Sequence, residues 1–380
     1  MRKICAALVL LTLLPLLPRA GAVELDVEGK SAVLMDTATG TILYEKNAHE
    51  KLAPASVTKV MTMLLIMEAV DSGKIGWNDM VTASEAAAAK GGSQIYLKVG
   101  ETMSVSDMVK SIAVSSANDC ACAMAEYLYG SEAAFVDAMN TRAQELGMKD
   151  TNFVNCTGLD DGADAQNHKT SAYDIALMSR ELLVKHPDIK KFTTIWMDTV
   201  RNGEFGLSNT NKLIRFYSGA TGLKTGFTSG AGYCLSATAE REGMELIAVV
   251  MGCETSNIRN AACKAMLDYG FANYAVIAPE MEGVPAVPVR LGTADSITLV
   301  PGETGKILID KALKSGITTE LALETEVTAP VAPGQQLGTL TIRSGEQILS
   351  RVPLVAQVEV PRLKWGQLLV LVLHKLAMAG

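Results

Sequence analysis

An apolar segment that directly follows a short polar motif constrains the fold of this chain more than any other feature. Residues 60–67 are apolar except for Thr62, so they predict a helix buried on all sides in a large core. Pro54 favours a helix start just before this segment, because its missing N–H would have no partner in a first turn. Ser56 and Lys59 lie one turn apart, so a neutral lysine amine could take the proton of the serine hydroxyl. The segment therefore predicts a nucleophile at the start of the central helix.

Two further motifs give this pair its significance. Ser116-Ala117-Asn118 and Lys224-Thr225-Gly226 each occur once in the chain and follow the first motif in this order. A Ser-x-x-Lys pattern alone is expected by chance about once in a chain of this length, and a serine or asparagine can simply cap a helix. The three motifs together are typical of penicillin-binding proteins and class A β-lactamases.

Length and composition favour a folded protein with two domains. The chain has 380 residues, of which 48% are hydrophobic, so it can bury a full core. Its formal net charge is -7, only 5% of its residues are aromatic, and no basic stripe with interleaved aromatic residues is present. These features argue against a nucleic-acid partner.

The start of the chain predicts export. Three residues including Arg2 and Lys3 precede an apolar run at residues 4–17, and small residues follow, ending at Ala22. This is the pattern of a secretory signal peptide that is cleaved after Ala22. Cleavage would also remove Cys5.

The other cysteines and the histidines predict no metal site and no cofactor. The six remaining cysteines are spread too widely for a small disulfide scaffold, and most are expected to be small buried hydrophobic residues. They are Cys120, Cys122, Cys156, Cys234, Cys253 and Cys263. A disulfide between two of them is the alternative. The four histidines, of which His168 is interpreted as structural, form no His-Glu-x-x-His motif.

Strand-like segments bracket a helix-rich middle in the first 278 residues. The predicted strands form two hairpins, residues 31–35 with 41–44 and residues 233–239 with 245–251. Residues 106–129 have helical spacing and carry the second motif near their beginning, and residues 257–274 predict another helix. The economical arrangement is an α+β fold, in which helices cover both faces of one antiparallel sheet and Ser56 lies at the seam.

The C-terminal third has a different character. After Pro279, short strands recur between turns that contain Gly or Pro, which predicts a small all-β sandwich or short barrel. Residues 363–376 are apolar, contain Trp365 and are too short to span a bilayer, so they suit an interfacial anchor on the outer face of the cell membrane. A helix docked on its own protein is the alternative. The expected organisation is a signal peptide at 1–22, a penicillin-binding serine peptidase domain at 23–278, a β-sandwich domain at 279–361 and an amphipathic anchor helix at 362–380.

From residue 31 onward, the chain resembles a serine-type D-alanyl-D-alanine carboxypeptidase, a low-molecular-mass penicillin-binding protein of the S11 peptidase family. Residues 171–174 and 221–232 carry this resemblance in addition to the three motifs. The resemblance implies that the chain removes the terminal D-alanine from peptidoglycan pentapeptide stems through an acyl-enzyme on Ser56. It also implies covalent inhibition by penicillin, so the expected partners are peptidoglycan stem peptides, β-lactams and the membrane surface.

The resemblance assigns the groups of acyl transfer. Ser56 is the expected nucleophile and Lys59 its base, with a pKa lowered by burial or by the neighbouring cation of Lys224. Ser116 is implied to pass a proton to the leaving amine. The backbone N–H groups of Ser56 and Phe227 are implied to form the oxyanion hole.

The remaining site residues are expected to bind the substrate. Asn118 is implied to bond the substrate's peptide group, and Gly226 would let the substrate backbone approach the edge of the sheet. Lys224 and Thr225 would hold the terminal carboxylate together with Arg259, which can bond it in bidentate fashion. The alternative for Arg259 is a surface charge at a helix start.

Other functions use the same motifs. A class A β-lactamase needs a deacylating glutamate, and no matching Glu-x-x-x-Asn follows the second motif. A D,D-endopeptidase or transpeptidase would use the same residues on another substrate. A non-catalytic wall-binding protein would keep the site as a receptor, and release of D-alanine from a peptide ending in D-Ala-D-Ala separates it from the enzymes.

Overall fold

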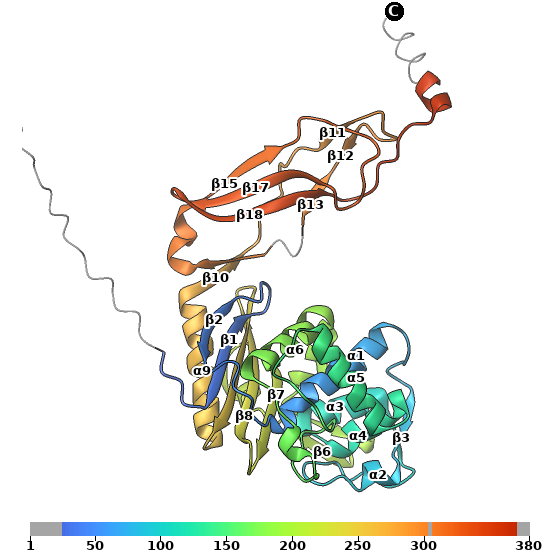
Figure 1. The fold of residues 1–380 in the computed structure, drawn as a ribbon, viewed down its shortest axis with the longest axis vertical. Helices are drawn as coiled ribbons and strands as arrows, with labels where there is room; N and C mark the ends of the chain where they lie inside the picture. Colours follow the sequence, from blue (N-terminus) through green and yellow to red (C-terminus); the bar gives the residue numbers. More distant parts are fainter. Residues whose placement is uncertain (1–24, 303–305, 371–380) are drawn as a thin grey trace, which may run out of the picture.

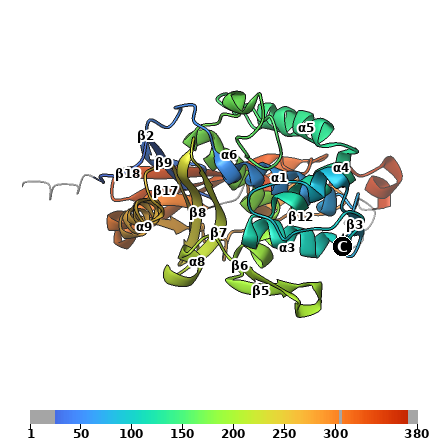
Figure 2. The ribbon, with the colours of Figure 1, turned by 90° about the horizontal axis from the view of Figure 1, so that it is seen from below.

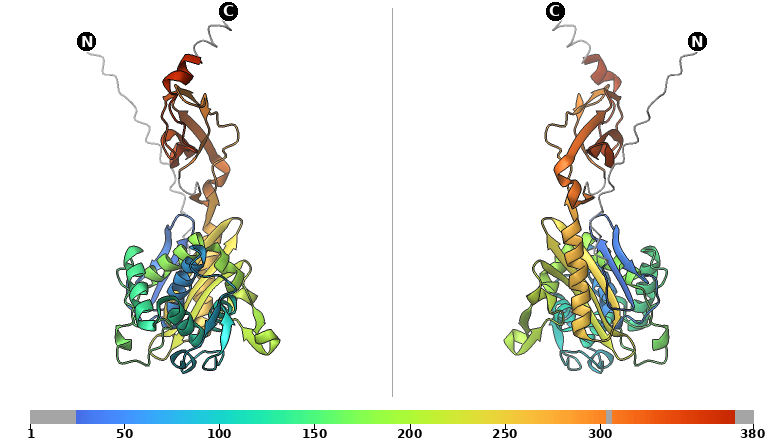
Figure 3. Two further views of the ribbon diagram at one scale, coloured as in Figure 1. Left: turned by 90° about the vertical axis from the view of Figure 1, so that its right-hand side faces the viewer. Right: turned by 90° about the vertical axis from the view of Figure 1, so that its left-hand side faces the viewer.

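The computed structural model describes residues 25–302 and 306–370. The predicted signal peptide and the last ten residues of the predicted anchor lie outside this part of the chain. Two parts follow one another along the long axis of the molecule (Figures 1 and 3). A helix-and-sheet part contains the three motifs, and a β-rich part follows it in the sequence.

The first part is built on one antiparallel sheet of five strands in the order β2-β1-β9-β8-β7. The strands are β1 (Ser31–Asp36), β2 (Ile42–Lys46), β7 (Ala220–Thr228), β8 (Gly232–Arg241) and β9 (Met244–Cys253). Pairing of β1 with β9 brings the two ends of this part together, which confirms the predicted sheet. β7, which carries the third motif, is an edge strand.

Helices cover both faces of this sheet (Figures 1 and 2). The helices of this part are α1 (Lys59–Asp71), α2 (Glu85–Ala88), α3 (Val105–Ser115), α4 (Asn118–Tyr129), α5 (Glu132–Glu145), α6 (Ala172–Lys185), α7 (Lys190–Thr193), α8 (Leu213–Phe216) and α9 (Ser256–Asn273). Successive residues of a strand point to opposite faces, and β1 shows the result. Leu34 joins the core under α9, whereas Met35 joins the larger core around α1. The predicted α+β fold is therefore confirmed.

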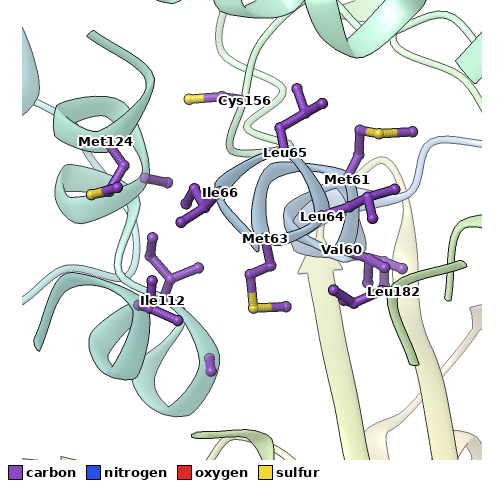
Figure 4. Packing of buried hydrophobic residues seen from close by; sticks show 14 of the residues in the cluster. Val60, Met61, Met63, Leu64, Leu65, Ile66, Ile112, Met124, Cys156 and Leu182 are labelled. Carbon is purple, nitrogen blue, oxygen red and sulfur yellow. The ribbon is translucent and has the colours of Figure 1, made fainter. Parts of the chain in front are cut away.

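The core surrounds α1, as the apolar segment predicts. Residues 59–67 are all buried. Figure 4 shows the helix enclosed by Ile112 of α3, Met124 of α4 and Leu182 of α6. Each fully buried aliphatic side chain contributes about 1.5–3 kcal/mol. The packing therefore holds the start of α1 firmly within the core.

The predicted helical stretch over residues 106–129 is wrong in one respect. α3 ends at Ser115 and α4 begins at Asn118, so the second motif lies at a break between two helices and not near the beginning of one. Ser116 adopts the left-handed conformation with φ 63°. Apolar spacing does not reveal the break, because Ile112 before it and Ala121 after it face the same core.

Short strand pairs lie beside the helices. They are β3 (Met80–Thr82) with β4 (Thr102–Ser104) and β5 (Met197–Val200) with β6 (Phe205–Ser208). The β5–β6 hairpin projects from the body of the molecule beyond β7 (Figure 2).

The β-rich part is a small sandwich, as predicted. Its strands are β10 (Tyr274–Ile277), β11 (Val287–Arg290), β12 (Ser296–Ile297), β13 (Leu299–Pro301), β14 (Ile307–Asp310), β15 (Ile317–Leu323), β16 (Val327–Thr328), β17 (Gln336–Ser344) and β18 (Gln347–Ala356). A three-stranded and a four-stranded sheet enclose one apolar core. β10 follows α9 directly and pairs with β14, so this ribbon joins the two parts.

A helical segment at residues 365–370 ends the described chain. It lies at the end of the sandwich that is remote from the helix-and-sheet part (Figures 1 and 3). Among the described residues, no helix has both the length and the apolar character that crossing a membrane requires.

Candidate active site

Ser56 and Lys59 lie together at the start of the central helix. Ser56 sits in a 3-10 turn (Ala55–Thr58), and α1 begins at Lys59. The Lys59 Nζ is 3.0 Å from the Ser56 Oγ and donates to the Thr157 carbonyl at 2.8 Å. Burial lowers the pKa of the Lys59 amine to about 7, while Cys156 and Asp119 act in the opposite direction. A neutral amine near physiological pH can accept the serine proton.

The break between α3 and α4 places two buried polar side chains. Asn118 donates its backbone N–H to the Ser93 carbonyl and its side-chain Nδ2 to the Gly91 carbonyl, both at 2.7 Å. The Asn118 Oδ1 and the Ser116 Oγ are buried and have no partner among the described residues. Neither side chain caps a helix. An unpaired buried polar atom costs about 1–3 kcal/mol, so these two atoms are suited to bond a ligand.

The third motif places a second buried lysine on the edge strand. Lys224 donates to the Thr225 carbonyl at 2.9 Å and has no ion-pair partner in the described chain. Burial, with the cations of Lys59 and Arg259 as further causes, holds the pKa of Lys224 well below its usual value. The Thr225 Oγ1 lies 2.7 Å from the Thr210 Oγ1.

Arg259 adds a further cation to this region from the first turn of α9. Its side chain is buried, with the residue 6% exposed, so the alternative of a surface charge is wrong. The guanidinium lies over the Tyr233 ring at 5.8 Å, and Nε donates to the Asn260 Oδ1 at 3.1 Å. No described carboxylate neutralises it. Lys224 and Arg259 are buried basic groups without a described acidic partner, and burial lowers the pKa of each, so a bound carboxylate would stabilise their charged forms.

Gly226 brings the edge strand β7 against the turn that carries Ser56. A Cβ on Gly226 would lie 2.6 Å from the Pro54 carbonyl oxygen and 3.1 Å from the Ser56 nitrogen. Glycine is therefore required for the strand to pack on this turn. This reason differs from the one expected from the sequence, namely that Gly226 lets the substrate backbone approach. The Phe227 ring is 53% exposed and lies 4.2 Å from the Tyr233 ring.

Several contacts of the site involve residues that the motifs do not single out. The Thr157 carbonyl holds Lys59, and Gly158 packs against the turn that carries Ser56. His168 contacts Thr58 inside the first motif, with 2.7 Å between its Nε2 and the Thr58 Oγ1. A carbonyl acceptor has no residue-type signal, but the position of Thr58 within the motif could have indicated a role.

The chain matches two protein-family models. Residues 19–255 match the model described as D-alanyl-D-alanine carboxypeptidase. Residues 282–362 match the model described as penicillin-binding protein 5, C-terminal domain. The first match covers the helix-and-sheet part except α9, and the second covers the sandwich from residue 282 onward.

Curated relatives and solved structures agree with these matches. The chain is 46% identical to D-alanyl-D-alanine carboxypeptidase DacF of Bacillus subtilis (strain 168) over 340 residues, which cover 88% of this chain and 86% of the relative. Its structure resembles penicillin binding protein 5 from Haemophilus influenzae with TM-score 0.75 and 31% identity. The match covers 90% of this chain and 100% of that one. It also resembles penicillin-binding protein D2 from Listeria monocytogenes in the ampicillin-bound form, with TM-score 0.57 and 32% identity over 64% of this chain and 98% of that one.

Proposed function

Because the chain belongs to the S11 peptidase family and is a serine-type D-alanyl-D-alanine carboxypeptidase, we propose that it cleaves peptidoglycan pentapeptide stems through an acyl-enzyme on Ser56. One observation carries this assignment. The Ser56 hydroxyl lies 3.0 Å from a buried lysine amine whose pKa is about 7. A hydroxyl beside such an amine is an activated nucleophile.

The first half of the proposed reaction transfers the acyl group to Ser56. Neutral Lys59 takes the hydroxyl proton as the Ser56 Oγ bonds to the carbonyl carbon of the penultimate D-alanine. The N–H groups of Ser56 and Phe227 bind the oxyanion that forms. As the intermediate collapses, the C–N bond breaks, and the proton held by Lys59 passes through Ser116 to the nitrogen of the leaving D-alanine.

The second half regenerates the enzyme. Lys59, again neutral, takes a proton from a water molecule that attacks the ester carbon. The ester bond to Ser56 then breaks, and its oxygen takes the proton from Lys59. The carboxylic acid that forms releases its remaining proton to solvent, and the shortened peptide leaves as a carboxylate.

The proposed binding residues explain the preference for a free C-terminus. Lys224, Thr225 and Arg259 hold the terminal carboxylate, and Asn118 bonds the adjacent peptide group. The burial of Lys224 and Arg259 without a described acidic partner supports this assignment, because a carboxylate would stabilise their charged forms. A β-lactam presents a strained acyl group and a carboxylate in a similar geometry, so the same residues bind penicillin, which acylates Ser56.

Release of D-alanine should depend on pH through Lys59. Below pH about 7 the amine is protonated and cannot act as a base, so kcat/KM should fall by about tenfold per pH unit. Above this pH the amine is neutral and the rate should level off. The measurement is D-alanine release from a peptide ending in D-Ala-D-Ala between pH 5 and pH 9, with a peptide ending in D-Ala-L-Ala as control. Absence of release, or a rate independent of pH across this range, would contradict the assignment.

We further propose the domain organisation and location of the protein. Residues 23–278 form the peptidase domain, residues 279–361 the sandwich domain, and residues 362–380 bind the outer face of the cell membrane. Trp365 is 87% exposed, and Leu369 and Val370 are also largely exposed, so no described residue covers these apolar side chains. Aromatic and aliphatic side chains of this kind favour the interface of a bilayer.

Truncation after Pro361 should release the protein from membranes. Loss of the apolar side chains of the terminal helix should lower partitioning onto lipid vesicles by at least about tenfold. Vesicle co-sedimentation measures this. The double substitution Trp365→Ser and Leu369→Ser should reproduce much of the effect, whereas Val99→Ser, at an exposed apolar residue of the peptidase domain, should not. Unchanged sedimentation of the truncated chain would show that the attachment lies elsewhere.

A further inference from the structure

A chain of hydrogen bonds leads from a buried histidine to the peptide bond that precedes Ser56. The Val154 N–H donates to the His168 Nδ1 at 3.0 Å, so the proton of the neutral imidazole is on Nε2. This Nε2 lies 2.7 Å from the Thr58 Oγ1. The Thr58 hydroxyl in turn donates to the Ala55 carbonyl oxygen at 2.8 Å. Each group has one partner to donate to, so the direction of the whole chain is fixed.

This chain of hydrogen bonds ends at the carbonyl of the Ala55–Ser56 peptide, whose N–H lies on the opposite side of the same group. The Ala55 carbonyl and the Ser56 N–H belong to one planar group, so a bond that holds the carbonyl also sets the direction of the N–H. This N–H is one of the two proposed oxyanion donors. Ala55 has a φ of 48°, a left-handed conformation that costs a residue with a side chain about 1–2 kcal/mol. The peptide therefore needs a restraint to keep this orientation.

The residues around these hydrogen bonds supply that restraint and exclude water. Thr58 is fully buried and His168 nearly so. Gly158 packs so closely that a Cβ there would lie 1.8 Å from the Ala55 oxygen. Burial, helped by the charges of Lys169 and Lys59, lowers the pKa of His168 to about 4. The imidazole thus stays neutral, with the same donor and acceptor, wherever the enzyme has a neutral base at Lys59.

We propose that His168 and Thr58 are positioning residues of acyl transfer, which hold the Ala55–Ser56 peptide so that the Ser56 N–H points at the developing oxyanion. The inference rests on the proposed role of Ser56. It assigns His168 no proton transfer, because its two ring nitrogens are occupied by Val154 and Thr58. Since the oxyanion exists only after attack, the positioning acts on the rate of acylation and not on the binding of the substrate.

Two pairs of substitutions in the full chain test this role. Thr58→Val removes the hydroxyl at nearly constant volume, and Thr58→Ser keeps it. His168→Ala removes the donor and acceptor, and His168→Gln keeps one of each. Stopped-flow acylation by a fluorescent penicillin separates the acylation rate constant from the initial dissociation constant. Thr58→Val and His168→Ala should lower the rate constant by about tenfold to a hundredfold and change the dissociation constant by less than about threefold. Thr58→Ser and His168→Gln should stay within about threefold of the wild type.

The outcomes separate this inference from the function on which it rests. Thermal unfolding and the mass of the Ser56 adduct are measured for every variant. If the wild type is acylated and Thr58→Val reacts at the wild-type rate, the positioning role is overturned and the function stands. Equal losses in rate and binding, or no recovery with Thr58→Ser, would show that the residues support only the fold. A wild type without an adduct would overturn the proposed function and this inference with it. Because Thr58→Val replaces one buried hydroxyl with a methyl group of similar volume, and Thr58→Ser keeps the hydroxyl, the test holds even if His168→Ala does not fold.

Discussion

Ser56→Ala should abolish covalent uptake of penicillin and lower D-alanine release by roughly 10⁴-fold or more. The substitution removes the oxygen that forms the acyl bond, and residual catalysis can come only from binding and the oxyanion donors. The fold should survive, because the Ser56 side chain makes one hydrogen bond, to Lys59, and a bond of this kind contributes about 1 kcal/mol. Lys59 keeps its bond to the Thr157 carbonyl.

Intact-mass spectrometry after incubation with penicillin measures the adduct directly. Ser72→Ala is a matched control, because Ser72 follows the other end of α1 and its hydroxyl also makes one hydrogen bond, to the Ala69 carbonyl at 3.2 Å. This variant should take up one penicillin like the wild type. An undiminished adduct on Ser56→Ala would place the nucleophile at another residue.

Arg259→Ala should impair the enzyme selectively on substrates with a free C-terminus. Loss of a buried charged hydrogen-bond partner costs about 2–3 kcal/mol, which corresponds to a fall in kcat/KM of roughly 30- to 150-fold on the free acid. A peptide amide has no negative charge to lose, so its already low kcat/KM should change by less than about threefold. The ratio between the two substrates should therefore shrink. Arg259→Lys should recover part of the loss, since lysine supplies the charge without the bidentate geometry.

Steady-state rates on matched peptides that end in D-Ala-D-Ala or its amide measure this ratio. Lys264→Ala is the control, because Lys264 is exposed on the same helix, α9. It should leave both rates unchanged. If Arg259→Ala lowers kcat/KM equally on the acid and on the amide, the arginine supports the packing of α9 and does not bind the carboxylate.

The sequence predicts those parts of the molecule that local spacing determines. The separation of Ser56 and Lys59 by one turn is sufficient to bring their side chains together, and the apolar run after them is sufficient to bury α1. Short β-prone runs likewise predict the strands β1, β2, β8 and β9 of the sheet. The break at Ser116 escapes this approach, because the residue in the left-handed conformation is a serine and not a glycine. A continuous apolar pattern on both sides of the break then resembles a single helix.

Contacts between distant segments set the rest of the site. Thr157 is 98 residues from Lys59 and contributes a carbonyl, a group that every residue has. His168 is 110 residues from Thr58, and its spacing in the sequence carries no sign of their contact. The pKa of Lys59 depends on burial by all of these segments together. Only the folded arrangement therefore reveals which distant residues contact Lys59 and the turn that carries Ser56.

Two glycines that pack on the turn of Ser56 restrict the substitutions that this part of the site can accept. Gly158 has a φ of +82°, and a Cβ there would overlap the Ala55 oxygen at 1.8 Å, while a Cβ on Gly226 would lie 2.6 Å from the Pro54 oxygen. Every replacement of glycine adds at least this atom, so neither position can accept another residue without displacing the turn that carries Ser56. Phe227 is 53% exposed, so other side chains can be accommodated more readily at this position.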